Sequence, residues 1–223
     1  MCFSAEVSLA TAALLIPVGI VCLKTSIKIN KSYWAFALFP FMFGVQQLME
    51  GIVWLGLGGN YENLILPATF VFLFFSHLFW LTWVPFSSYL TETNTIKRRL
   101  FIVITIVGVL FGMSMYIPLL TQTDWVKVSI QHHSIYYEVK IMHDAYIPRY
   151  ATTLIYASII LFPLLFSSDR YHKVLGILLM VSGIVSWAFL GLVFISVWCF
   201  FAAIISFYIF YQVVLTKHNL PSV

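Results

Sequence analysis

The sequence has little charge: of its 223 residues, 9% are Asp, Glu, Lys or Arg, while 61% are hydrophobic. A soluble domain of this length could not bury so much apolar surface, whereas lipid can solvate it. The net charge of +4 comes from small clusters beside apolar runs, which is not the basic surface of a nucleic-acid-binding protein. The composition therefore predicts an all-α membrane protein and no nucleic-acid partner.

Familiar catalytic and structural motifs are also missing. The three cysteines form neither a CxxC pair nor a disulfide framework, and there is no HExxH or HxxxH metal motif. No internal repeat gives direct support to an inverted-repeat transporter. The last apolar run carries no Lys, which excludes a retinal Schiff base at that position.

The apolar runs are long enough for seven transmembrane helices of about 20 residues each. Pro40 and Gly44 are expected kink points in the second, and the third should end near Pro85. The 42-residue run 174–215 is predicted to be two helices joined by a turn between Trp187 and Ile195. The five earlier spans are predicted over 5–23, 33–57, 64–84, 100–120 and 150–166, and residues 1–223 form one domain.

The loop charges predict the orientation of the chain. Nine of the 12 Lys and Arg residues fall on one side of a seven-span bundle. They are Lys24, Lys28, Lys31, Lys97, Arg98, Arg99, Arg170, Lys173 and Lys217. The positive-inside rule then places the C-terminus in the cytoplasm and the N-terminus outside.

The loop 121–149, between the fourth and fifth spans, is the one sizeable loop expected outside the membrane. Apolar and polar residues alternate in it on both sides of His132, His133 and Ser134. Alternation with a period of two residues is typical of strands. We expect a β-hairpin that covers the outer mouth of the bundle.

Ionisable side chains lie within the predicted spans. Glu50, His77 and Cys199 each fall in the outer half of a different span, about 6 to 20 Å deep at 1.5 Å per residue. Charge inside a membrane is costly and therefore marks functional sites by default. The sequence thus predicts one polar pocket that is open to the outside.

Two kinds of chemistry suit this set of residues. Carboxylate, imidazole and thiolate groups could bind a divalent metal such as zinc, or act as nucleophile, base and orienting group. The candidate catalytic residues are Cys2, Glu50, His133 and Cys199. The candidate metal ligands are Cys2, Glu50, His77, His132, His133 and Cys199. The candidate pocket-lining residues are Gln46, Gln47, Trp54, Ser76, Trp80, Tyr136, Ser196 and Trp198.

Structural roles compete with these assignments. A neutral Glu50 could bond to Gln46 or to another helix, and His77 could tie two helices together. Cys199 taken alone is more often a packing residue, and loop histidines are most often solvated. The GxxxG spacing of Gly108 and Gly112 indicates close helix packing.

Four groups of residues form recognisable motifs: Met1 to Ala5, Phe43 to Glu50 with Trp54, His132 and His133 followed by Tyr136, and Ser196 to Cys199 with Ala202. In these motifs the sequence resembles a family of uncharacterised bacterial multi-pass membrane proteins. The resemblance implies that Cys2, Gln47, Glu50, Trp54, a loop His, Trp198 and Cys199 act together. It does not include His77 and implies no particular reaction.

Three functions remain open at this stage. The first is a metal- or thiol-dependent enzyme acting on a lipid or another outer-leaflet substrate. The second is a small proton-coupled transporter or channel that uses Glu50, and the third is a receptor or assembly subunit. In each case the sequence predicts a multi-pass protein of the bacterial inner membrane, with lipids as partners and a homo-oligomer as an option.

Overall fold

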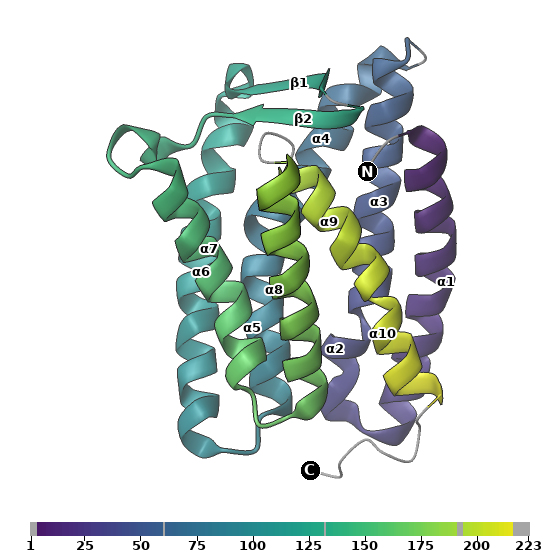
Figure 1. The fold of residues 1–223 in the computed structure, drawn as a ribbon, viewed down its shortest axis with the longest axis vertical. Coiled ribbons are helices and arrows are strands. Elements are labelled where there is room, and N and C mark those ends of the chain that lie inside the picture. Colours follow the sequence, from purple (N-terminus) through teal and green to yellow (C-terminus); the bar gives the residue numbers. More distant parts are fainter. Residues whose placement is uncertain (1–3, 60, 132, 191–193, 216–223) are drawn as a thin grey trace.

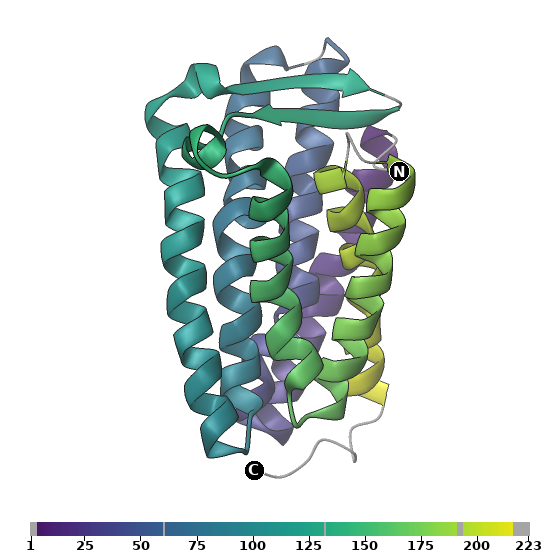
Figure 2. The same ribbon diagram turned by 60° about the vertical axis from the view of Figure 1, so that its left-hand side comes forward.

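The computed structural model describes residues 4–59, 61–131, 133–190 and 194–215. Within these ranges it is mostly helical, with seven helical spans long and apolar enough to cross a membrane and one small antiparallel sheet. The spans stand side by side as a bundle, and the sheet covers one end of it (Figure 1). We call this the hairpin end; the chain enters its first helix there, and the last helix finishes near the other end (Figure 2).

The spans differ in how regular they are. α1 (Ala5–Ile29) and α6 (Thr95–Thr121) are unbroken. The second span comprises η1 (Lys31–Tyr33), α2 (Trp34–Ala37) and α3 (Phe39–Leu57). The third comprises η2 (Glu62–Leu64), α4 (Ile65–Phe74), η3 (Phe75–Phe79) and α5 (Trp80–Thr91). α7 (Arg149–Phe166), α8 (Arg170–Leu190) and finally α9 (Phe194–Ile205), α10 (Phe207–Phe210) and η7 (Tyr211–Leu215) complete the bundle.

The predicted kinks and ends are only partly right. The second span is interrupted at Leu38, beside Pro40, as expected. Gly44 lies in an uninterrupted stretch of α3, where a β-carbon would meet Ile16 of α1 at 2.8 Å. Gly44 is therefore a packing residue and not a kink.

The prediction that the third span ends near Pro85 is wrong, because α5 continues through this residue to Thr91. Proline has no backbone N–H, so the Leu81 carbonyl loses its helical donor. That carbonyl lies against Gly108 of α6, 2.0 Å from the place where a β-carbon would stand. The absence of a side chain at Gly108 lets the two helices meet closely there.

The predicted division of the last apolar run agrees with the structure. α8 ends at Leu190 and α9 begins at Phe194, both within the expected window. The connection, including Gly191, lies outside the described residues.

The alternating segments of the loop form the expected hairpin. β1 (Val126–Gln131) pairs with β2 (Ser134–Val139) in antiparallel register, with Gln131 opposite Ser134. Two 3-10 turns flank it, η4 (Thr123–Trp125) and η5 (Met142–Ala145). Tyr137 stacks on Phe72 of α4 with ring centroids 4.6 Å apart, which holds the sheet against the end of the bundle.

Candidate functional site

A buried polar network joins the second and third spans. Gln46, Gln47 and Glu50 are fully buried on one face of α3. Gln47 donates from Nε2 to the Glu50 carboxylate at 3.0 Å, and Trp80 donates from Nε1 to the Gln46 amide oxygen at 2.8 Å. The spacing of Gln47 and Glu50, three residues apart, brings them together on the helix surface. The bond to Trp80 depends on the packing of two helices.

Cys199 of α9 lies beside this network. The thiol is 8% exposed and is close enough to interact with both the Glu50 carboxyl and the Gln46 amide. α9 packs on α3, which brings these groups together across about 150 residues of sequence. The predicted convergence of Glu50 and Cys199 is therefore found in the structure.

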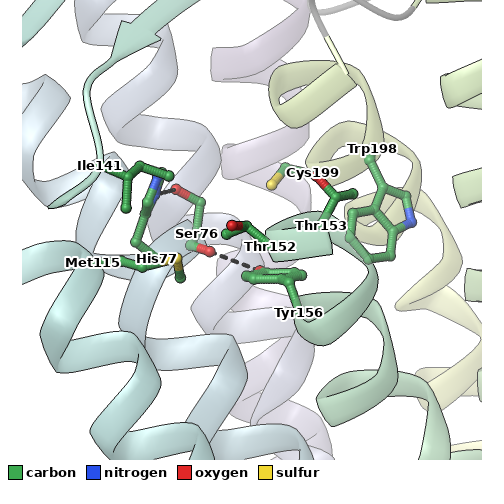
Figure 3. A pocket seen from close by; sticks show the side chains of 9 residues that line it. All are labelled: Ser76, His77, Met115, Ile141, Thr152, Thr153, Tyr156, Trp198 and Cys199. Atoms are coloured by element: carbon green, nitrogen blue, oxygen red, sulfur yellow. Dashed lines mark hydrogen bonds between the residues drawn. The ribbon is translucent and has the colours of Figure 1, made fainter. Parts of the chain in front are cut away.

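On its other side, Cys199 opens into a cavity of about 100 Å³. A water molecule needs roughly 10 to 15 Å³ of such space, so the cavity can hold several waters or the polar end of a ligand. Figure 3 shows Ser76 and His77 on one side of it and Cys199 with Trp198 on the other. The lining residues are Ser76, His77, Met115, Ile141, Thr152, Thr153, Tyr156, Trp198 and Cys199.

The wall that carries His77 is a single π-helical turn, η3, in which the backbone N–H of Trp80 donates to the Phe75 carbonyl. Such turns inside α-helices occur frequently at functional sites. The turn also presents the Ser76 carbonyl, which accepts a hydrogen bond from the Tyr156 hydroxyl of α7 at 2.7 Å. Tyr156 thereby ties the third span to the fifth at the cavity.

The hydrogen bonds around His77 indicate its tautomer. Nδ1 lies 2.8 Å from Ser76 Oγ, and the Ser76 hydroxyl donates its proton to the Leu73 carbonyl at 3.4 Å. A hydroxyl has a single proton, so Ser76 Oγ accepts from Nδ1, which carries the proton and leaves Nε2 as a proton acceptor. His77 therefore has the hydrogen-bonding state of a general base.

Other predicted site residues lie away from the cavity. His133 is exposed at the turn of the hairpin with a φ of 56°, and Tyr136 lies on β2, where it pairs with Ser129. Trp54 does not line the cavity and packs against the apolar cluster that includes Cys199. Cys2, His132 and the side chain of Ser196 lie outside the described residues.

The described residues do not form the predicted metal site, two of whose candidate ligands, Cys2 and His132, lie outside them. Among the residues that the structure describes, no three His, Cys, Asp or Glu side chains are grouped as a metal ion requires. His133 faces solvent at the hairpin turn instead of joining Glu50 and Cys199. The chemistry of the described site is thus that of a thiol, an imidazole, a carboxyl and hydroxyls.

Sequence reasoning missed part of the cavity wall. Thr152 and Tyr156 are four residues apart and share one face of α7. This polar stripe in an apolar span was a signal that could have identified them. Met115 and Ile141 carry no such signal, because apolar residues are typical of any transmembrane helix and of any loop segment that packs on one.

A second buried polar cluster, at the other end of the bundle, was also missed. Asp169 accepts from the Tyr33 hydroxyl at 2.5 Å and lies 3.2 Å from His172 Nδ1. Burial raises the pKa of Asp169, but the hydrogen bonds and charge of His172 and the bond from Tyr33 outweigh it and hold the pKa below its ordinary value of 3.8. A short polar loop in the sequence gives no sign that this carboxylate is buried.

The fold and site define a class: a multi-pass α-helical membrane protein with a cavity between its spans, lined by thiol, imidazole and hydroxyl groups among apolar side chains. Residues 1–222 match the family of unknown function DUF6629, and the chain belongs to that family. No curated protein and no solved structure matches it.

Proposed function

We propose that this protein is a membrane-embedded thiol enzyme that acts on an amphiphilic molecule reaching the cavity at the hairpin end. The observation that supports this best is the cavity itself, which gives one bound molecule access to the Cys199 thiol, the His77 imidazole and four hydroxyl side chains. Nucleophile, base and hydrogen-bond donors within one small space are what acyl or group transfer requires.

Each side chain has a role in this proposal. Cys199 is the nucleophile, and Glu50 behind it or His77 across the cavity takes its proton. Tyr156 fixes the π-helical turn and so the position of His77, while Gln47 holds Glu50 and Gln46 holds Trp80. The loop charges support an N-terminus outside the cytoplasm, which puts the cavity in the outer half of a bacterial inner membrane.

The reactivity of Cys199 tests the proposal without a known substrate. The protein in detergent is treated with a small thiol reagent, such as methyl methanethiosulfonate, and the labelled cysteine is identified by mass spectrometry. We expect Cys199 to react, because it lines a cavity, and Cys22 not to react, because its side chain is fully buried among apolar groups.

Variants then separate chemistry from access. His77→Gln and Glu50→Gln should slow labelling of Cys199 and shift its dependence on pH, because each removes a proton acceptor. Thr153→Val changes a cavity wall without removing an acceptor and should leave the rate unchanged. If Cys199 labels no faster than Cys22, or if neither acceptor variant changes its rate, the proposal is wrong.

A proton-coupled transporter is the second candidate, favoured by buried carboxyl groups toward both ends of the bundle, Glu50 and Asp169. The space next to Cys199 on the side of Trp80 is only about 30 Å³ and is lined mainly by apolar groups such as Phe39, Phe43 and Val84. A conduction pathway needs polar groups along its length. Proton flux into liposomes that disappears in Glu50→Gln would favour this second function.

A further inference from the structure

A groove between α7 and α8 runs along the membrane-facing side of the cavity. Its volume is about 600 Å³, within the roughly 300 to 1,000 Å³ typical of ligand sites. Leu154, Ile184 and Trp187 line it and are 64%, 59% and 70% exposed within two of the spans. Side chains so exposed on a transmembrane helix face lipid, so the groove opens to acyl chains.

The floor of the groove is built for close packing. Gly183 has no side chain, and a β-carbon there would lie 3.3 Å from the Trp198 indole nitrogen. Trp198 in turn donates from Nε1 to the Leu179 carbonyl at 3.2 Å. The indole therefore presents an apolar ring to the groove while its polar atom is satisfied.

The groove ends at an arginine that is ion-paired with an aspartate. Arg149 opens α7 at the hairpin end and lines the groove, and its side chain is 57% exposed. Asp144 binds Nε and Nη2, and the Val139 carbonyl also binds Nη2. Among the described residues, these bonds fix the plane of the guanidinium and use two of its three nitrogens, which leaves Nη1 for an anionic oxygen.

The groove and the cavity are neighbours. Thr153 and Trp198 line both, so one layer of side chains separates a molecule in the groove from the space beside Cys199. Thr153 is exposed, and Trp198 is half-buried. A movement of either side chain would join the two spaces.

We infer that this groove binds a phospholipid, with one acyl chain between α7 and α8 and the phosphate on Arg149. An apolar channel facing lipid, with a single fixed guanidinium at its end, matches an amphiphile that has one anionic head group. That this lipid is the substrate rests on the proposed function; that it binds here does not.

The test uses tryptophan quenching by lipids with brominated acyl chains. The protein is placed in nanodiscs with a small fraction of brominated phosphatidylglycerol, and the contribution of Trp187 is isolated by comparison with Trp187→Phe. A specific site holds the brominated lipid more often than the fraction of this lipid in the bilayer predicts. We expect about a ten-fold preference for the brominated lipid over bulk lipid, which is equivalent to about 1.4 kcal/mol.

Matched variants locate the lipid. Ala157→Phe fills the groove and should remove the preference, whereas Ala13→Phe places the same ring on the exposed surface of α1 and should not. Brominated diacylglycerol, which lacks a phosphate, should show no preference. Arg149→Gln should reduce the preference for the brominated phospholipid to that of the diacylglycerol, and Arg149→Lys should retain part of the preference.

Quenching at the level of random contact in the wild-type protein would overturn the inference, as would a preference that survives Ala157→Phe. Equal quenching by phospholipid and diacylglycerol would remove the role of Arg149. Because this readout does not involve Cys199, its failure leaves the thiol proposal standing, and failure of thiol labelling leaves the lipid site standing.

Discussion

The contact between Gly108 and the Leu81 carbonyl makes Gly108→Ala an informative substitution. Pro85 removes the helical donor of this carbonyl, and Gly108 provides the space into which it fits. A β-carbon at residue 108 would stand 2.0 Å from the oxygen, whereas real contacts are 3.0 Å or longer. α5 and α6 would have to separate by about 1 Å, a typical consequence of overpacking.

Two opposing terms set the size of the effect. Overpacking of this kind costs about 1 to 3 kcal/mol. Replacing Gly by Ala within a helix stabilises the folded state by roughly 0.5 to 1 kcal/mol, which opposes this cost. Because the obstacle is backbone and not a flexible side chain, we expect a net loss of about 2 kcal/mol, or about 4 to 8 °C in melting temperature.

The measurement is thermal unfolding in detergent, followed by tryptophan fluorescence. Gly58→Ala is the matched control, because a β-carbon there would meet only atoms 3.5 Å away, in ordinary contact. Its melting temperature should change by less than the equivalent of about 0.5 kcal/mol. If Gly108→Ala proves as stable as this control, the close approach of α5 and α6 is not as described.

Two further predictions concern buried hydrogen bonds. Tyr156→Phe leaves the Ser76 carbonyl without its donor and should cost about 1 to 3 kcal/mol and change the rate of Cys199 labelling. Tyr116→Phe removes a similar bond, from its hydroxyl to the Phe70 carbonyl at 3.1 Å, and should leave the rate of Cys199 labelling unchanged. Equal labelling rates in the two variants would count against a positioning role for Tyr156. Asp169 has a pKa below 3.8 in the folded protein, so its contribution to stability is present above that pH and is lost as the pH falls through 3.8 toward the folded value. Unfolding curves between neutral pH and pH 3 should therefore show a loss of stability in the wild type that is smaller in Asp169→Asn, and parallel curves would contradict this reasoning.

Much of the fold followed from local features of the sequence. Apolar runs of membrane length predict spans whatever their neighbours are, because the bilayer sets the length and each helix satisfies its own backbone. The period-two alternation of β1 and β2 likewise depends only on adjacent residues. The pairing of Gln47 with Glu50 needs no more than one turn of helix. These are the parts of the structure that the sequence by itself determined.

The tertiary structure decided which polar groups meet. The bond from Trp80 to Gln46 joins residues 34 apart, that from Tyr156 to Ser76 joins residues 80 apart, and that from Tyr33 to Asp169 joins residues 136 apart. Hydropathy cannot select these partners, because every span is apolar toward lipid and the choice depends on side-chain packing between helices. The cavity beside Cys199 exists for the same reason. Four helices meet there, and the shape of the cavity depends on how they pack together and not on the sequence of any one of them.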